Sequence, residues 1–169
     1  CRYKLPDPDV DSTPFVKLFT LFDKYDICAL FYIGGNDSMD TIAKLSRYGA
    51  QVGSSVRFIG VPKTIDNDLC LTDHTPGYGR AIEFSTLQRC ASHLASRTDV
   101  NEAYAVGGAA AAAAFAGETG RMISLKRLTG TPYQCITESV DVQQVANLEK
   151  KVPLDWIAPD GMQVTAAFE

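Results

Sequence analysis

The chain has 169 residues, of which 46% are hydrophobic and 21% are charged, a composition typical of one globular core. Its 20 acidic and 16 basic residues are dispersed and give a formal net charge of −4, so no run of Lys and Arg is available to neutralise a polyphosphate backbone. This excludes nucleic acid as the expected partner. No apolar stretch approaches the roughly 18 residues of a membrane span, so we expect no membrane partner and a cytoplasmic protein.

The first two elements are predicted from residues 15–33. The segment FVKLFTLFDKYD has apolar residues at helical spacing, with Ser12 or Thr13 as N-cap and Pro14 in the first turn, and this predicts a helix. The following ICALFYI is a continuous apolar run that ends at Gly34 and Gly35. Such a run is typical of a central strand buried on both faces of a parallel sheet.

A second helix and strand follow. DSMDTIAKLSRYGA, started by Asp37 or Ser38, predicts a helix, and VRFIGV predicts another buried strand. The order helix, strand, helix, strand indicates an α/β fold with three layers and a mostly parallel, doubly wound sheet. Ligands of such sheets bind beyond the carboxyl ends of the strands, where the segments GGNDS and PKTIDND both fall.

The last third of the chain predicts a helix, a strand and a second helix. Thr98 or Asp99 forms a capping box with Glu102, and the alanine run that follows is a strong helix former closed by Gly117. RMISLKR predicts the strand. Residues 145–164 predict a helix, with Trp156 anchoring a tail to which we assign no chemistry.

The five cysteines are widely spaced and odd in number, and no CxxC pair is present. They are Cys1, Cys28, Cys70, Cys90 and Cys135, and only His74 and His93 could join them in a metal site. This pattern favours buried cytosolic thiols over a zinc site.

The segment GGNDS, residues 34–38, has the features of a phosphate cradle. Gly34 and Gly35 let the backbone approach a ligand closely, and Asn36, Asp37 and Ser38 lead into a helix whose first N–H groups can bind phosphate oxygens. A tight strand-to-helix turn with an N-cap gives the same pattern, so the glycine pair alone leaves both interpretations open.

The segment PKTIDND, residues 62–68, places two carboxylates at the end of the next strand. Asp66 is suited to take a proton from an attacking hydroxyl, and Asp68 to help hold Mg²⁺. A turn capped by its own aspartates is the alternative, and it is favoured if this loop is considered alone.

Taken together, the two loops resemble those of the phosphofructokinase family. The resemblance implies that Asp66 is the base for the sugar 1-hydroxyl, that Asp68 is its partner acid and that Thr64 contacts the sugar. Asn36 stands where the family has an acidic residue, and it would offer Mg²⁺ a carbonyl ligand.

Two positions indicate the phosphoryl donor. Asp37 and Lys63 stand where ATP-using members have glycine, and they match the pyrophosphate-dependent branch of the family. A carboxylate at Asp37 would repel an α-phosphate, and the Lys63 ammonium would hold the far end of pyrophosphate. The resemblance thus implies transfer from pyrophosphate to fructose 6-phosphate, a step of glycolysis; an ATP-dependent kinase is the alternative.

Arginines complete the implied site. By resemblance Arg2 contacts the donor phosphate, and Arg80 and Arg89 grip the 6-phosphate of the sugar, with forked side chains that bind phosphate oxygens in pairs. We divide the chain into a donor-binding lobe, residues 1–79, and a sugar-phosphate segment, residues 80–169, and expect the full-length form to be a homo-oligomer.

The sequence departs from the family at one junction. Gly79 runs directly into Arg80, whereas relatives have a long stretch there that includes a Met-Gly-Arg motif, which this sequence lacks. We therefore interpret the chain as a shortened form and expect negligible turnover and a wide separation of Gly79 from Arg80. A non-catalytic, phosphate-binding or regulatory subunit is the further alternative.

Overall fold

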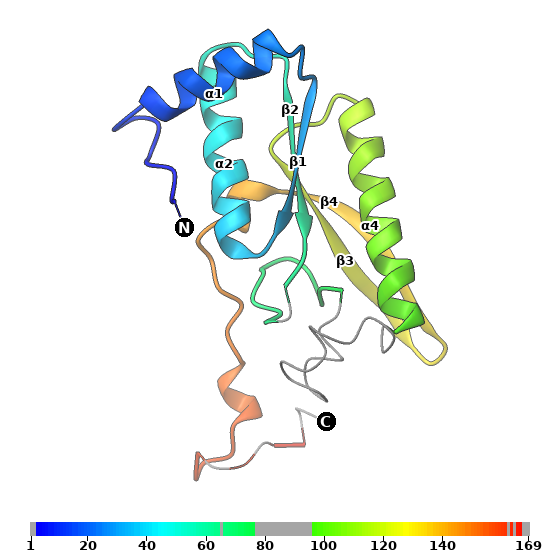
Figure 1. The fold of residues 1–169 in the computed structure, drawn as a ribbon. Helices are drawn as coiled ribbons and strands as arrows, with labels where there is room; N and C mark the ends of the chain where they lie inside the picture. Colours follow the sequence, from blue (N-terminus) through cyan, green and yellow to red (C-terminus); the bar gives the residue numbers. More distant parts are fainter. Residues whose placement is uncertain (1–2, 65, 77–95, 162, 164, 167–169) are drawn as a thin grey trace.

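A computed structural model describes residues 3–64, 66–76, 96–161, 163 and 165–166. The elements in chain order are α1 (Thr13–Lys24), β1 (Ala29–Gly34), α2 (Asn36–Gln51), β2 (Arg57–Pro62), α4 (Arg97–Phe115), β3 (Arg121–Gly130), β4 (Tyr133–Asp141), η3 (Val142–Gln144) and η4 (Leu154–Trp156) (Figure 1). The predicted junction of Gly79 with Arg80 lies outside the described residues.

The four strands form one sheet in the order β1-β2-β3-β4. β1 pairs with β2 and β2 with β3 in parallel, and β3 pairs with β4 as an antiparallel hairpin. The predicted α/β fold with a mostly parallel sheet is confirmed. The hairpin makes the sheet mixed, because a short turn can join only antiparallel neighbours.

Helices cover both faces of the sheet, which gives three layers (Figure 1). Consecutive residues of β2 point to opposite faces. Phe58 packs with Phe15, Phe19 and Ile42 in the core under α1 and α2, whereas Ile59 belongs to a second core under α4. A Cβ on Gly60 would lie 2.6 Å from the sulfur of Met39, so the close approach of α2 to β2 requires glycine there.

The prediction that β1 is a central, doubly buried strand is wrong. Within the described residues β1 lies at the edge of the sheet and pairs only with β2. Phe31, Tyr32 and Ile33 are 41%, 41% and 66% exposed. The apolar run correctly predicted a strand, but periodicity does not reveal which face or edge receives a neighbour.

Two predictions for the last third of the chain are also wrong. The N-cap of α4 is Ser96, with no side-chain capping bond, and Glu102 turns away from the helix start to His74 and Tyr133. The described residues between 145 and 163 do not form a long helix: η4 is a single 3-10 turn in which Trp156 is half-buried. Pro153 and Pro159 interrupt that segment, since proline has no N–H to donate. Gly117, with φ +87°, does close α4 as predicted.

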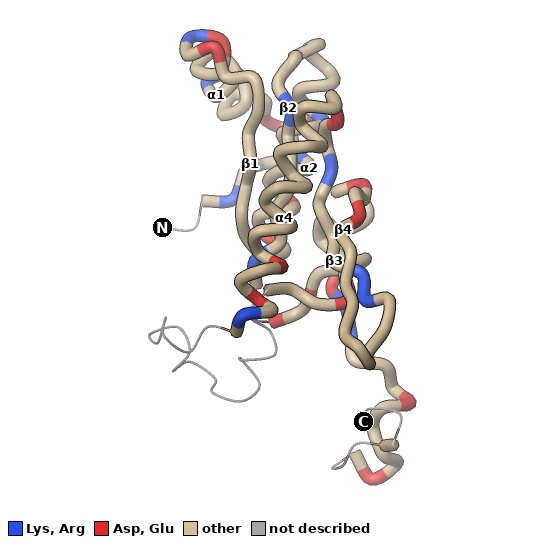
Figure 2. Tube along the Cα trace, turned by 90° about the vertical axis from the view of Figure 1, so that its right-hand side faces the viewer, with Lys and Arg blue, Asp and Glu red and all other residues tan. Residues whose placement is uncertain are grey.

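Charges are spread over the described molecule. Figure 2 shows Lys and Arg positions alternating with Asp and Glu along the trace. None of the described helices is long and apolar enough to cross a bilayer.

Candidate functional site

The parallel pairing of β1 with β2 brings the two predicted loops together. We call residues 34–38 the glycine loop and residues 63–68 the acidic loop; residue 65 is outside the described part. Gly34 pairs with Pro62, and the Lys63 N–H donates to the Gly34 carbonyl at 3.0 Å. Both loops therefore start side by side at the carboxyl ends of adjacent strands, where doubly wound sheets bind ligands.

The glycine loop has no room for a side chain at Gly34. A Cβ there would lie 2.0 Å from the Ser38 hydroxyl oxygen and 2.8 Å from its Cβ, whereas a Cβ on Gly35 would make an ordinary contact of 3.4 Å with the Thr64 Cβ. Gly35 is the N-cap of α2, and its carbonyl accepts from the N–H groups of Ser38 and Met39. The helix start thus faces the acidic loop directly. Its first N–H groups have no partner within the helix.

The acidic loop is organised by Thr64, which is 9% exposed. The Asp66 N–H donates to the Thr64 hydroxyl oxygen at 3.1 Å, and this hydroxyl donates to an Asp66 carboxylate oxygen at 3.5 Å. The Thr64 carbonyl accepts a hydrogen bond from buried Thr75. Asp66 is exposed, so a solvent-accessible carboxylate is held on a loop with a buried anchor.

Asp68 is the second acid of this loop, and it has an unsatisfied atom. Its Oδ1 is buried and has no hydrogen-bond partner among the described residues. A buried carboxylate oxygen without a partner is costly, and a divalent cation with hard oxygen ligands would satisfy it. On this observation the acidic loop fits Mg²⁺.

Asn36 is bonded to a later segment of the chain. Its side-chain oxygen accepts from the Asn147 N–H at 3.1 Å and its amide nitrogen donates to the Leu148 carbonyl at 3.3 Å. The oxygen has a second lone pair, so these bonds leave the predicted metal role of Asn36 open.

Asp37 and Lys63 are both on the surface, and they differ in their partners. Lys4 lies 3.0 Å from the Asp37 carboxylate, in a pair whose side chains are 73% and 71% exposed. An ion pair this exposed contributes little to stability. For Lys63, no salt bridge to another described residue is present, so its ammonium is available to an anion. Arg2, Arg80 and Arg89 lie outside the described residues.

The segment of residues 147–150 runs across both loops. Besides its bonds to Asn36, it donates the Lys150 N–H to the Asp68 carbonyl at 3.0 Å. The Lys150 ammonium donates to the Thr72 and Asp73 carbonyls. Sequence reasoning missed this contact because it predicted a helix here.

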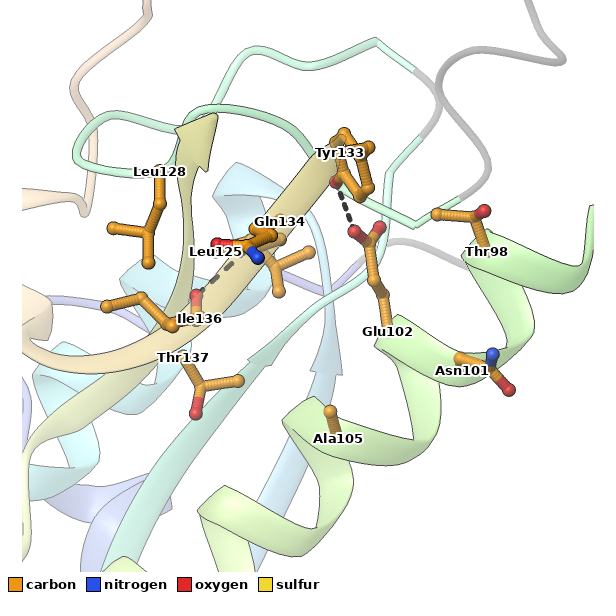
Figure 3. A pocket seen from close by; sticks show the side chains of 11 residues that line it. Thr98, Asn101, Glu102, Ala105, Leu125, Leu128, Tyr133, Gln134, Ile136 and Thr137 are labelled. Carbon is orange, nitrogen blue, oxygen red and sulfur yellow. Dashed lines mark hydrogen bonds between the residues drawn. The ribbon is translucent and has the colours of Figure 1, made fainter. Parts of the chain in front are cut away.

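A second polar cluster lies outside the two loops, beside a cavity of about 730 Å³ between α4 and the β3-β4 hairpin (Figure 3). Tyr133 of β4 and Glu102 of α4 point towards each other, and the Tyr133 hydroxyl donates to Glu102. His74 lies 2.8 Å from the other Glu102 carboxylate oxygen. No residue of the glycine or acidic loop lines this cavity.

Two groups beside this cavity have shifted pKa values. Burial, together with the bond to Glu102, raises the pKa of Tyr133 far above its ordinary value, so its hydroxyl stays protonated and donates. Burial also raises the pKa of the Cys135 thiol. The prediction of buried thiols holds only in part, since Cys28 is exposed and Cys70 and Cys135 are half-buried.

Known proteins are similar to this chain in sequence. Residues 6–113 match the family model described as phosphofructokinase. The pyrophosphate–fructose 6-phosphate 1-phosphotransferase of Halomonas elongata is 25% identical over 298 residues, an alignment that covers 98% of this chain and 71% of the relative. Since this chain has only 169 residues, many positions of that alignment have no counterpart here. This finding confirms that the chain is shortened relative to its relatives.

Two solved structures share the fold. The pyrophosphate-dependent phosphofructokinase from Nitrosospira multiformis has a TM-score of 0.85 and 24% identity, and covers 99% of this chain and 71% of that one. The enzyme of the same description from Marinobacter aquaeolei has a TM-score of 0.83, again with 24% identity, covering 99% of this chain and 70% of that one. The three-layer arrangement is thus the one these structures have.

Proposed function

This chain belongs to the phosphofructokinase family, and we propose that it serves the transfer of a phosphoryl group from pyrophosphate to the 1-hydroxyl of fructose 6-phosphate. The observation that carries the proposal is the contact between the glycine and acidic loops, where Gly35 abuts Thr64 at the carboxyl ends of β1 and β2. A donor bound at the start of α2 would lie next to the Asp66 carboxylate. The relatives' names point to the same substrates.

In the proposed reaction Asp66 is the general base. The 1-hydroxyl oxygen attacks the nearer phosphorus of pyrophosphate, the bridging P–O bond breaks, and inorganic phosphate leaves. The hydroxyl proton passes to an Asp66 carboxylate oxygen. Thr64 holds Asp66 in place through two hydrogen bonds, one to its carboxylate and one from its backbone N–H. Because Thr64 is buried, we propose that it acts on the sugar mainly by positioning Asp66 rather than by direct contact alone.

The donor is held, in this proposal, by the glycine loop and Lys63. The N–H groups at the start of α2 and the Ser38 hydroxyl face phosphate oxygens, and the helix dipole favours negative charge there. The exposed Lys63 ammonium binds the terminal phosphate. Asp37, beside the same helix start, disfavours the longer polyphosphate of a nucleotide through charge repulsion.

Mg²⁺ is the metal that this chemistry implies, and Asp68 is the residue that fits it. The ion, when bound, would neutralise charge that develops on the transferring phosphoryl group. Asp68 with Asp66 would supply carboxylate ligands, and substrate phosphates and waters would complete the shell. Asn36 would add a carbonyl oxygen through its second lone pair, because the bond from Asn147 uses only one.

The remaining assignments rest on the family resemblance. We propose that Arg2 binds the donor and that Arg80 and Arg89 bind the sugar 6-phosphate. We also retain a donor-binding segment, residues 1–79, a sugar-phosphate segment, residues 80–169, a homo-oligomeric full-length form and a cytoplasmic location. The two segments share one sheet, because β2 of the first segment pairs with β3 of the second.

A second candidate is a non-catalytic protein that binds pyrophosphate without transferring it. One observation favours it: the segment of residues 147–150 is bonded to Asn36 and to Asp68, at the edge of both loops. The chain also lacks many positions that the Halomonas elongata relative has, and this favours the same candidate. An ATP-dependent kinase is the rival within the enzyme class, and Asp37 and Lys63 argue against it.

The experiment compares the chain with a chimera. Pyrophosphate binding is measured by calorimetry, and fructose 1,6-bisphosphate formation is assayed with pyrophosphate or ATP. We expect the chain itself to bind pyrophosphate weakly with negligible turnover. Inserting the corresponding stretch of the Halomonas elongata enzyme between Gly79 and Arg80 should give turnover with pyrophosphate.

Each outcome has one interpretation. A chimera that binds pyrophosphate but forms no product supports the non-catalytic candidate. Turnover with ATP and none with pyrophosphate supports the rival kinase. Absence of pyrophosphate binding in both proteins refutes the donor site.

A further inference from the structure

Three side chains with metal-binding atoms converge beside the cavity drawn in Figure 3. They lie outside the two loops, but both neighbours of His74 contact the acidic loop: the Asn67 amide donates to the Asp73 carbonyl, and the Thr75 hydroxyl donates to the Thr64 carbonyl. They are His74 from the loop after β2, Glu102 from α4 and Cys135 from β4. One ligand atom from each residue lies within 4.8 Å of the other two. Among the described residues no other group of three such side chains is this close.

The surroundings of the cluster hold it in place. The buried Thr72 hydroxyl donates to the His74 carbonyl at 2.8 Å and accepts from the Leu125 N–H at 3.0 Å, which fixes the His74 loop against β3. The neighbouring Asp73 carboxylate accepts from the Arg127 N–H at 2.7 Å. A site whose ligands lie on fixed elements loses little freedom when an ion binds.

The His74 and Glu102 side chains are also largely buried, and one buried nitrogen of the cluster has no hydrogen-bond partner among the described residues. The side chains of His74 and Glu102 are 14% and 10% exposed. His74 Nδ1 is buried and has no hydrogen-bond partner among the described residues. A buried carboxylate needs a cation or several hydrogen bonds, and a buried ring nitrogen needs a partner. A bound cation would meet the first need. His74 would bind it through Nε2, the nitrogen that now faces Glu102, so Nδ1 would still need a partner of its own.

We propose that His74, Glu102 and Cys135 form a binding site for Zn²⁺ or a similar transition-metal ion, with a fourth position open to the cavity. The proposal is independent of the phosphoryl-transfer function proposed above. One nitrogen, one carboxylate oxygen and one thiolate sulfur are a ligand set that suits Zn²⁺ and Co²⁺. Mg²⁺ requires hard oxygen ligands, so this site discriminates against the ion implied at the acidic loop.

The geometry needs only a small adjustment. In a tetrahedral site with bonds of about 2.0–2.3 Å, neighbouring ligand atoms lie about 3.3–3.7 Å apart. The His74 Nε2 and Glu102 carboxylate oxygen are now 2.8 Å apart and hydrogen-bonded, and they would separate to admit the ion. The Cys135 sulfur lies within 4.8 Å of a ligand atom of each of the other two residues. The Cys135 side chain lies at the cavity wall, on the hairpin strand beside Tyr133.

The open position would hold water or a small anion. Three protein ligands with one exchangeable position are typical of reactive rather than purely structural zinc sites. The Tyr133 hydroxyl already donates to Glu102 and lies 3.1 Å from His74 Nε2, so it would act as a hydrogen-bond donor beside the ion and not as a ligand.

The test titrates the full chain with Zn²⁺ alone by calorimetry and with Co²⁺ by absorption spectroscopy. We expect one tight Zn²⁺ site per chain and a thiolate-to-cobalt charge-transfer band. Loss of a partner outside the ligand shell already costs about 10–100-fold in affinity, so Cys135→Ser and Glu102→Gln should each weaken Zn²⁺ binding at least about tenfold. Cys135→Ser should also abolish the band.

Matched variants separate this site from metal binding by other thiols. Cys28→Ser changes an exposed thiol and should leave affinity and band unchanged, and Tyr133→Phe should retain the band. Cys135→Ser is a conservative change at a half-buried position, so it keeps the test decisive if Glu102→Gln fails to fold. Absence of a tight Zn²⁺ site, or a band that persists in Cys135→Ser, would overturn the proposal. His74, Glu102 and Tyr133 would then serve only as a hydrogen-bonded anchor between the elements that carry them.

Discussion

Replacing Gly34 by alanine should destabilise the glycine loop because of a single local overlap. The new Cβ would lie 2.0 Å from the Ser38 hydroxyl oxygen and 2.8 Å from the Ser38 Cβ. The hydroxyl can rotate away, but the Cβ is fixed to the backbone of α2. Relief therefore requires a shift of the helix start or of β1, and overpacking of this kind typically costs about 1–3 kcal/mol.

The size of this loss of stability is measured by a double-mutant cycle, in which urea unfolding is followed by circular dichroism. Ser38→Gly alone should cost up to about 1 kcal/mol, because glycine is a poor helix former. Combined with Gly34→Ala it removes both clashing atoms, so the double variant should be more stable than the sum of the single changes predicts. The coupling energy should be about 1–2 kcal/mol, within the range found for residues in contact.

The control is a glycine of α4 at which a side chain would have free space. A Cβ on Gly108 would meet nothing within 4 Å, so Gly108→Ala should stabilise the chain by about 0.5–1 kcal/mol. If Gly34→Ala is as harmless as Gly108→Ala, or if the two loop substitutions are simply additive, the steric account of the glycine loop is refuted.

Three further predictions concern chemistry. In the chimera, Asp66→Asn should lower turnover by about 10²–10⁴ with sugar affinity nearly unchanged, and an undiminished turnover number would remove Asp66 from the role of base. Replacing Asp37 and Lys63 by glycine together should raise ATP use at the expense of pyrophosphate; a donor preference as strong as before would contradict the assignment. Because burial raises the pKa of Cys135, less of its thiol is ionised at a given pH, and mass-spectrometric mapping at neutral pH should show slower alkylation there than at exposed Cys28.

Local sequence pattern predicted those elements whose apolar residues recur with a clear period. The helices α1 and α2 and the strand β2 agree with the prediction, and their buried residues, such as Phe15, Ile42 and Phe58, lie at the expected spacing. β4 received no prediction, although Cys135, Thr137 and Ser139 alternate with Ile136 and Glu138 in a strand-like pattern. An antiparallel partner for β3 is visible only when the hairpin is considered as a unit.

The position of the candidate site could be predicted because it is set by the ends of β1 and β2. Two loops after adjacent parallel strands must meet, and the sequence places chemistry in both. The roles of Asn36 and Glu102 were not predictable in this way. Each side chain bonds to residues far away in sequence, Asn36 to residues 147–148 and Glu102 to His74 and Tyr133. A local motif gives a residue its expected chemistry, but its partners depend on the tertiary structure.

The segment of residues 147–150 connects the glycine loop to the acidic loop. It binds Asn36 at one loop and the Asp68 backbone at the other, so it adds a second link to the direct contacts of Gly34 and Gly35 with residues 63–64. The same segment uses the Asn36 amide that the family resemblance assigned to a metal. A later part of the chain therefore holds the residue that the resemblance assigned to a metal, while the Asp68 Oδ1 stays without a partner among the described residues. We expect a metal at the acidic loop to take most of its ligands from Asp66, Asp68 and the substrate's own phosphates, so its affinity should rise when pyrophosphate is bound.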